Sequence, residues 1–368
     1  MNTILHCIPS MGGGGAERQL TYLAGGLKDL GWQVHVALRE NGGVNLPRLE
    51  AAGATVHVLG TWHNYDPRNA SRIAAVVKSS GAQLVQTWLT AMDLCGSAGA
   101  RKAGVPWILS ERGDGRTYPE RLWALKNALR HRAAPYAAAI VCNSAAANIY
   151  WRVQAPRCLH YAVPNIVPVE QIEAAPAVSR EHLGASAADK LLVYAGRLER
   201  GKNLPLLLEA LSVLRRRMAV KLLVCGAGSQ SRALAASARR LGLGEAVLFA
   251  GYVDNLWSCL KAADAMISLS TVEGRPNAVL EAMACGCPLV LSDIDAHREV
   301  ANGAQAAFVQ QSSAPHVAAV LEEVLCKGPG DRAALQRAAE ACRAWSPAGI
   351  ATRYDRIYRD VLAGRGGR

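Results

Sequence analysis

Short apolar runs alternate with longer amphipathic stretches throughout the chain, and this alternation constrains the fold more than any other feature of the sequence. A short run of β-branched and other apolar residues is typical of a buried strand, whereas apolar residues three or four positions apart indicate a helix. Strands that alternate with helices form a parallel sheet with helices on its faces. In the first half the pattern predicts strands at residues 4–8, 33–38, 55–59, 83–87, 107–110 and 139–143, and helices at 17–30 and 69–80.

The same alternation starts again in the second half of the chain, which indicates a second sheet of the same type. Between the halves, Pro164, Pro168 and Pro176 lie in a stretch without a sustained apolar period, which is the composition of a linker. The predicted strands of the second half are residues 191–195, 221–225, 246–250, 265–269 and 288–292. We predict an N-terminal domain over residues 1–165, a linker over 166–189, a C-terminal domain over 190–346, and a helix within 347–368 that packs across the domain boundary.

The composition is that of a folded protein with two domains. The chain has 368 residues, of which 51% are hydrophobic and 19% charged, so disordered and fibrous proteins are excluded. Its apolar runs, such as residues 133–142, are shorter than the roughly 18 residues of a membrane span, and its start lacks the pattern of a signal peptide. We therefore expect a cytoplasmic protein. Several of the ten cysteines lie in apolar runs, so we expect free thiols and no metal site.

Four consecutive glycines, residues 12–15, separate the first predicted strand from the first predicted helix. Backbone amides in such a loop can approach an anion closely at the N-terminus of a helix, so Gly13 and Gly14 are candidate ligand contacts. A dinucleotide-binding loop would have a third glycine where this chain has Glu17, and the second strand is followed by Arg39 instead of an acid. A nicotinamide cofactor is therefore disfavoured, and a plain flexible turn remains the alternative.

A second strand-to-helix junction carries two cations. Arg197 and Lys202 follow the strand predicted at residues 191–195 and flank the start of the next helix. Two cations beside exposed helical amides suit a diphosphate at the carboxyl edge of a sheet. The alternative is a pair of solvated surface charges, which is the usual state of Arg and Lys.

The most specific stretch is residues 270–288, in which Glu273 precedes a predicted helix and Glu281 lies inside it. Two carboxylates near the edge of a sheet suit the hydroxyls of a sugar. Alternatively, Glu273 only complements the helix dipole and Glu281 is solvated or paired. The spacing alone does not separate these interpretations.

Together these motifs resemble those of the retaining glycosyltransferases of family 4, which have two Rossmann-like domains in the GT-B arrangement. The resemblance rests on Glu273 and Glu281 with seven residues between them, and on the sequence Ala-Met-Ala-Cys-Gly-Cys-Pro that follows. Gly196-Arg197-Leu198, Lys202-Asn203, the glycines 12–15 and Val163-Pro164-Asn165 add to it. It covers nearly the whole chain and implies an α/β protein with two Rossmann-like domains facing each other across a cleft.

The resemblance also implies roles for these residues. Arg197 and Lys202 would hold the donor diphosphate and neutralise it as it leaves, without an obligatory metal or other cofactor, and fixed cations stabilise that growing charge most in the transition state. Glu273 would contact hydroxyls of the donor sugar, and Glu281 would bind the nucleotide ribose. No enzyme nucleophile is implied. The remaining donor contacts would come from Gly13 and Gly14 and from the backbone at Asn277, Ala278 and Val279.

One position departs from the family pattern. Many relatives carry a His after the fifth strand of the first domain, whereas this chain has Ser110-Glu111-Arg112 there. A subset acting on N-acetylhexosamines or related surface sugars has a similar sequence, so Glu111 or Arg112, together with Asn165, is our candidate for the sugar or acceptor side. The alternative is that Glu111 and Arg112 only pair with each other at the surface.

Basic residues are concentrated in one segment. Residues 101–157 contain ten Lys or Arg and three acids, and so carry +7 of the net charge of +12. A helix predicted at residues 118–136 resembles an interfacial membrane helix, while an ordinary helix with a solvated basic face is the alternative. No recognition motif for nucleic acid accompanies the charge. The residues proposed to contact an anionic membrane are Arg121, Lys126, Arg130 and Arg132 with Leu122 and Trp123.

The sequence thus predicts a retaining glycosyltransferase of polysaccharide biosynthesis. Its donor would be a nucleotide diphosphate sugar, a UDP-sugar such as a UDP-N-acetylhexosamine, and its acceptor a polyprenyl-linked or surface glycan at the inner face of a membrane. Two alternatives are a nucleotide-sugar epimerase of the same architecture and a catalytically silent binding protein with this fold. Conversion of free nucleotide-sugar without an acceptor would favour the first, and the absence of donor hydrolysis would favour the second.

Overall fold

A computed structural model describes residues 2–113, 121–302, 305–311, 313–327 and 332–364, without the side chains of residues 121–124. The chain divides into two compact units, one formed by Met1–Ile166 with Trp345–Arg368 and the other by Val167–Ala344. Each unit contains one parallel sheet, of seven strands in the first and six in the second. The prediction of two Rossmann-like α/β units is therefore confirmed.

The first sheet has the strand order β3-β2-β1-β4-β5-β6-β7, so the winding direction reverses between β1 and β4. Every strand pair in it is parallel. The edge strand β7 was not predicted, because its residues are only partly buried and form no continuous apolar run. The strands are β1 Thr3–Ile8, β2 Gln33–Leu38, β3 Thr55–Val58, β4 Leu84–Trp88, β5 Trp107–Glu111, β6 Ala139–Cys142 and β7 Leu159–Ala162.

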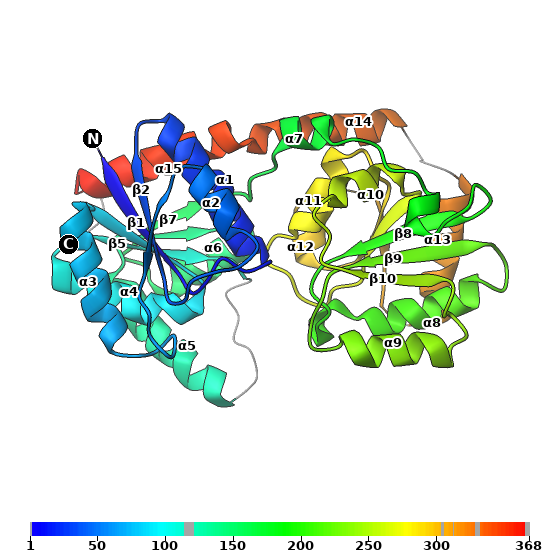
Figure 1. The fold of residues 1–368 in the computed structure, drawn as a ribbon, viewed down its shortest axis with the longest axis horizontal. Coiled ribbons are helices and arrows are strands. Elements are labelled where there is room, and N and C mark those ends of the chain that lie inside the picture. Colours follow the sequence, from blue (N-terminus) through cyan, green and yellow to red (C-terminus); the bar gives the residue numbers. More distant parts are fainter. Residues whose placement is uncertain (1, 114–120, 303–304, 312, 328–331, 365–368) are drawn as a thin grey trace. The chain divides into compact units, whose positions relative to one another are not determined.

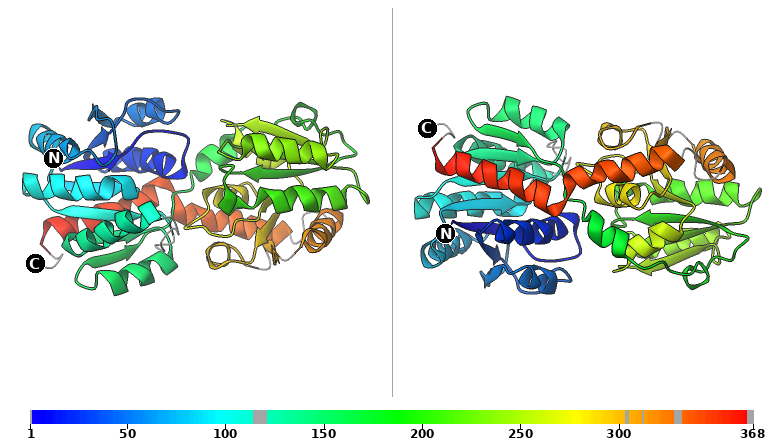
Figure 2. Two further views of the ribbon diagram at one scale, coloured as in Figure 1. Left: turned by 90° about the horizontal axis from the view of Figure 1, so that it is seen from below. Right: turned by 90° about the horizontal axis from the view of Figure 1, so that it is seen from above.

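Helices cover both faces of this sheet. One apolar cluster joins α1, α2 and α15 to side chains such as Ile4 and Ile8 of β1, and another joins α3, α4 and α6 to Leu5 and Cys7 of the same strand. Helices α1 and α15 lie side by side, although they are far apart in the sequence (Figures 1 and 2). The helices are α1 Gly15–Asp29, α2 Leu46–Ala51, α3 Arg68–Ser80, α4 Thr90–Ala103, α5 Arg121–Ala133, α6 Ala145–Gln154 and α15 Pro347–Leu362.

The second sheet has the order β10-β9-β8-β11-β12-β13, which reverses between β8 and β11. Its strands are β8 Lys190–Ala195, β9 Val220–Cys225, β10 Val247–Gly251, β11 Ala265–Ser268, β12 Leu289–Ser292 and β13 Ala306–Val309. Its helices are the 3-10 turn η3 Arg200–Lys202, α8 Leu204–Leu214, α9 Ser231–Arg240, α10 Leu256–Ala262, α11 Asn277–Ala284, α12 Asp295–Arg298, α13 Ala314–Lys327 and α14 Arg332–Ala341.

The connections between the halves are structured. Helix α7, Val169–Ala174, lies in the segment expected as a linker, and this segment belongs to the second unit from Val167 onward. The final helix α15 buries Ile350, Tyr354 and Tyr358 in the core of the first unit. None of the described helices combines the length and hydropathy that a membrane span requires.

Candidate functional site

The strand order of the second sheet reverses between β8 and β11, and the loops that follow these two strands bring a cation and an acid together. Lys202, from the 3-10 turn after β8, forms an ion pair with Oε1 of Glu273, from the loop after β11. The hydroxyl of Ser270 donates a 2.7 Å hydrogen bond to the same carboxylate oxygen. Parallel α/β sheets bind ligands outside the carboxyl ends of their strands at such a reversal. The Lys202 and Glu273 side chains are 22% and 15% exposed, so a ligand can reach both.

The other donor-side residues predicted in this unit lie at different depths, on the loop after β8 and on α11. Arg197 is exposed in the loop that follows β8. Glu281, on α11, is only 3% exposed, and Nε1 of Trp257 donates a 3.0 Å hydrogen bond to its Oε2. Asn277 and Ala278 are half-buried and Val279 is buried in the first turn of α11. Glu281 is therefore a buried and oriented acid.

A polar network behind Glu273 was missing from the sequence-based prediction. The carbonyl of Ser270 accepts hydrogen bonds from Ser292 Oγ at 2.6 Å and from Gln311 Nε2 at 3.0 Å. Gln311 Oε1 in turn accepts from Asn203 Nδ2 at 2.6 Å, and Asn203 has a left-handed φ of 53°. This network ties the loop of Lys202 to the loop of Glu273. Serines inside otherwise apolar strands were the available signal for it.

Buried His297 lies next to this network. Its Nδ1 donates a 2.9 Å hydrogen bond to the carbonyl of Ser292. Burial lowers the pKa of His297 below the ordinary value for an imidazole. A neutral His297 therefore supports the loop and adds no charge behind Glu273.

Two glycines that the sequence analysis did not single out allow the loop of Arg197 to fold. A Cβ on Gly226, whose φ is 141°, would lie 1.9 Å from the carbonyl oxygen of Gly196. A Cβ on Gly228 would lie 2.5 Å from the carbonyl oxygen of Leu198. The loops after β8 and β9 thus pack backbone against backbone, and Leu198 N donates to the carbonyl of Ala227 at 3.0 Å.

We expect Gly226→Ala to destabilise the protein by roughly 1–3 kcal/mol, the usual range for overpacking a tight site, and to weaken nucleotide binding, because the Gly196 loop must move. Gly244→Ala is the matched control in the same unit, since no atom lies within 4 Å of the Cβ position there. Urea denaturation and calorimetric titration with UDP measure the two effects. Equal behaviour of the two variants would show that the close approach has no such role.

In the first unit, the glycine loop follows β1 at the other reversal point. Asn45 holds it, because its Nδ2 donates to the carbonyl of Gly12 and its backbone N–H donates to the carbonyl of Met11 at 2.9 Å. Gly13 is exposed, and Gly14 is the N-cap residue of α1. Helix amides therefore end at an open glycine loop at the carboxyl edge of this sheet.

Glu111 and Arg112, at the end of β5, point into two separate networks and do not pair with each other. Glu111 Oε2 accepts from Arg130 at 2.7 Å and from Trp151 Nε1 at 3.0 Å, while its Oε1 accepts from the N–H of Gly113 at 2.8 Å. Arg130 also bonds Asp93 Oδ2 at 2.6 Å, so a buried cation lies between two buried acids. The alternative of a surface pair between Glu111 and Arg112 is wrong.

Arg112 contacts a different set of residues from Glu111. Its guanidinium donates to Asn165 Oδ1 at 3.2 Å and to the hydroxyl of Tyr354 at 2.9 Å, and it lies 4.0 Å above the ring of Trp88. Asn165 itself is 3% exposed. The structure therefore brings Arg112 and Asn165 together, as the sequence-based candidate set did.

Burial and charge act in opposite directions on the two acids around Arg130. Burial raises the pKa of Asp93 above its ordinary value, in spite of the attraction of Arg130 and the hydrogen bond from Thr87. Burial also acts to raise the pKa of Glu111, but Arg130 and the N–H donors of Gly113 and Trp151 outweigh it, so that pKa lies below its ordinary value.

This geometry corrects the predicted membrane-contact set. Arg130 is 5% exposed and belongs to the buried ion triad, so it cannot face a membrane. Lys126 lies with its Nζ 4.8 Å above the ring of Tyr65. Arg121, Leu122 and Trp123 lie outside the described side chains.

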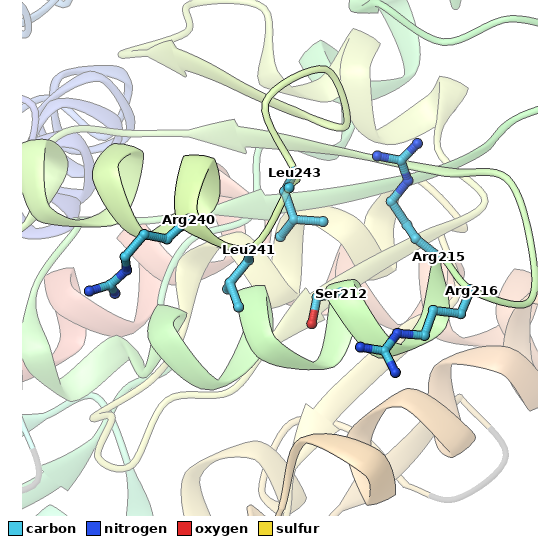
Figure 3. A pocket seen from close by; sticks show the side chains of 7 residues that line it. Ser212, Arg215, Arg216, Arg240, Leu241 and Leu243 are labelled. Atoms are coloured by element: carbon cyan, nitrogen blue, oxygen red, sulfur yellow. The ribbon is translucent and has the colours of Figure 1, made fainter.

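A hollow of about 540 Å³ elsewhere on the second unit is not this site. It lies where α8 and α9 end, at the amino edge of the sheet, and is lined by Ser212, Arg215, Arg216 and Arg240 among others. The guanidinium groups point in different directions and do not converge on a common ligand position (Figure 3). Within the described part of the chain, no group of three or more His, Cys, Asp or Glu could hold a metal ion.

Two α/β units, each built on one parallel sheet, are the architecture of the GT-B class of glycosyltransferase folds. A crystal structure of HepE from Anabaena in complex with UDP and glucose has the same fold, with a TM-score of 0.84, 20% identity, and coverage of 98% of this chain and 100% of that chain. Residues 177–341 match the family Glycosyl transferases group 1, and residues 13–171 match Glycosyltransferase Family 4. Each half of the chain thus matches the model of a glycosyltransferase family.

Curated relatives are similar over parts of their length. N-acetylgalactosamine-N,N'-diacetylbacillosaminyl-diphospho-undecaprenol 4-alpha-N-acetylgalactosaminyltransferase of Campylobacter jejuni is 32% identical over 123 residues, which is 32% of this chain and 33% of that protein. Phosphatidyl-myo-inositol mannosyltransferase of Mycobacterium leprae is 28% identical over 218 residues, 57% of this chain and 56% of that protein. The chain thus matches about a third of the first relative's length and just over half of the second's.

Proposed function

We propose that this protein transfers a sugar from a nucleotide diphosphate donor, a UDP-sugar such as UDP-N-acetylhexosamine, to a lipid-linked or surface glycan, with retention of the anomeric configuration. The Lys202–Glu273 pair at the reversal of the second sheet carries the proposal, because it offers a cation for phosphate beside an acceptor for sugar hydroxyls. The names of the Campylobacter and Mycobacterium relatives, which specify lipid-linked and lipid substrates, support the acceptor class. The sugar transfer would take place at the cytoplasmic face of a membrane.

Binding of the nucleotide-sugar donor would rearrange the ion pair between Lys202 and Glu273. The diphosphate competes for Lys202, and Arg197 adds a second cation from the neighbouring loop. Glu273 remains held by Ser270 and becomes an acceptor for hydroxyls of the donor sugar. As the bond between the sugar and the diphosphate breaks, negative charge grows on the leaving group, and the two cations stabilise it without a resident metal. The acceptor attacks from the face that the diphosphate leaves, so no enzyme nucleophile is required.

The roles that we propose for the other candidate residues rest on their burial and hydrogen bonds. Glu281, oriented by Trp257, would bind the nucleotide ribose, and the amides of α11 at residues 277–279 and of the Gly13-Gly14 loop would add donor contacts. On the acceptor side, Arg112 with Asn165 is the stronger candidate, because both carboxylate oxygens of Glu111 already accept hydrogen bonds. Glu111 would then fix the end of β5 that presents Arg112.

A thermal-shift screen with UDP-, GDP-, ADP- and dTDP-sugars tests the donor, since a ligand that binds only the native state raises its stability by mass action. The donor that binds is then incubated with and without a polyprenyl-linked glycan, and the products are identified by mass spectrometry and anomeric NMR. Conversion of the donor without an acceptor would identify an epimerase. Binding with neither transfer nor donor hydrolysis would identify a silent binding protein.

The two acids are expected to respond differently to neutralisation. Glu273→Gln should lower turnover more than nucleotide affinity, because its proposed partner is the sugar. Glu281→Gln should weaken binding of both UDP and the UDP-sugar, because its proposed partner is the ribose they share, and the glutamine can still accept from Trp257. Calorimetric affinities and transfer rates for both variants check this, and identical profiles would remove the division of roles.

A further inference from the structure

The described part of helix α5 buries polar side chains and exposes apolar ones, which is the reverse of an ordinary surface helix. Amphipathic helices bury their apolar side. Among the described side chains of α5, however, the buried ones are Asn127 and Arg130, whereas Leu125 is 63% and Leu129 40% exposed. The triad of Arg130 with Glu111 and Asp93 holds the polar side against the sheet. Leu125 and Leu129 are thus available to an apolar partner outside the protein.

The neighbouring helix α6 also exposes apolar side chains. Ile149 and Val153, one turn apart, are 65% and 72% exposed, and Tyr136 between the helices is 85% exposed. A hydrogen bond between two partly buried side chains joins the two helices: His131 Nε2 and the hydroxyl of Tyr150 lie 2.6 Å apart. We call these outward residues the α5–α6 surface: Leu125, Leu129, Tyr136, Ile149 and Val153.

The segment that forms the α5–α6 surface carries charge of one sign. Residues 121–157 contain six Lys or Arg and no Asp or Glu. Of these cations, Arg130 is neutralised within its buried triad, while Arg132, Arg152 and Arg157 are exposed beside the apolar side chains. A second copy of the chain would set these cations against each other in a symmetric contact. Exposed apolar side chains on a segment whose own charges are all cationic instead complement the acyl chains and phosphates of an anionic lipid leaflet.

We propose that the α5–α6 surface binds an anionic membrane, with its apolar side chains in the interfacial layer and Arg132 and Arg152 at lipid phosphates. This inference rests on the lipid-linked acceptor of the proposed function and gives it a location. Arg130 and Trp151, under the surface, both hydrogen-bond Glu111 at the end of β5. Membrane binding would therefore bring the strand end that carries Arg112 close to the lipids that bear the acceptor.

The test is cosedimentation of the full chain with phosphatidylcholine vesicles and with vesicles containing phosphatidylglycerol, across a salt series. Ile149→Gln with Val153→Gln removes apolar contacts, and Arg132→Glu with Arg152→Glu reverses charge, all at exposed positions. Each double variant should lower the partition onto anionic vesicles at least tenfold. Binding should fall steeply as salt rises, since the Debye length is about 10 Å at 0.1 M.

Matched controls lie away from the α5–α6 surface. Leu30→Gln with Leu248→Gln changes two exposed apolar residues, and Arg232→Glu with Arg239→Glu reverses two cations on α9. These variants should bind anionic vesicles as the parent does. Equal loss in the controls, equal binding of the parent to neutral and anionic vesicles, or binding to neither kind would overturn the proposal.

Two further measurements separate this inference from the transferase proposal. Nucleotide affinity and donor hydrolysis without vesicles should be the same in the surface variants and the parent. Salt-sensitive vesicle binding in a protein that transfers no sugar would contradict the transferase and leave the membrane surface standing, and sugar transfer without vesicle binding would do the reverse. If sedimentation velocity shows that Ile149→Gln with Val153→Gln converts a dimer to a monomer, the surface is an interface between copies and the membrane proposal is wrong.

Discussion

Replacing Arg197 and Lys202 together by alanine is expected to weaken the binding of UDP at least tenfold. A hydrogen bond to a charged group contributes about 1.5–3 kcal/mol, and two such contacts to a diphosphate would correspond to more than a hundredfold. The expected loss is smaller because Lys202 already has an anionic partner in Glu273 and exchanges it for phosphate. Arg197, exposed in its loop, should account for the larger share.

Calorimetric titration of the double variant and of both single variants with UDP measures these contributions. Arg200→Ala is the matched control, because Arg200 is an exposed cation in the same 3-10 turn. Its affinity should stay within about twofold of the parent, since long-range attraction between exposed charges is largely screened at ordinary salt. A folded double variant that binds UDP as tightly as the parent would contradict the diphosphate assignment.

Replacing Arg130 by methionine is expected to lower the free energy of unfolding by about 3–5 kcal/mol, the usual effect of removing one partner from a buried ion pair. The substitution leaves the carboxylates of Asp93 and Glu111 buried without their common cation. Urea denaturation at pH 7 measures the loss. Arg132→Met, an exposed position two residues along the same helix, should change the stability by less than about 0.5 kcal/mol.

The loss in Arg130→Met should become smaller as the pH falls. In the parent, the lowered pKa of Glu111 supplies stability above the unfolded value of about 4.3, and this stability disappears as the pH falls through the native pKa. Without Arg130, burial raises the pKa of Glu111 against only the N–H donors of Gly113 and Trp151, and the pKa of Asp93 rises further, so both acids bind protons at a higher pH than in the parent. A loss that is constant between pH 7 and pH 5 would contradict this account.

Much of the fold could be predicted from periodicity. The β2 strand, Gln33–Leu38, has the predicted ends, and the final helix, Pro347–Leu362, lies within the predicted range 347–368. Valines at alternating positions mark the start of the strand, and a regular helical spacing marks the helix. The strand β13, Ala306–Val309, was missed for the same reason as β7, since two of its four residues are only partly buried. Edge strands lack the continuous apolar pattern that marks a central strand.

Part of the candidate site was also predictable. Lys202 and Glu273 follow two strands of one parallel sheet, and the carboxyl ends of parallel strands share an edge, so their proximity follows from topology. The buried triad does not follow, because Arg130 is 37 residues from Asp93 and 19 from Glu111, and its sequence context is that of a basic surface helix. The pattern of α5 predicted that its cations face a membrane, whereas the structure turns Arg130 inward and exposes Leu125 and Leu129.

The helix α15 belongs to the first unit although the whole second unit precedes it in the sequence. Its side chains Ile350, Tyr354 and Tyr358 fill the same core as Leu20 and Leu23 of α1. During synthesis, therefore, we expect the first core to stay incomplete when its seven strands have left the ribosome, because α15 is translated only after the whole second unit. The second unit is continuous and can complete its own core earlier. We therefore expect the reverse of the usual order, in which the N-terminal domain folds first.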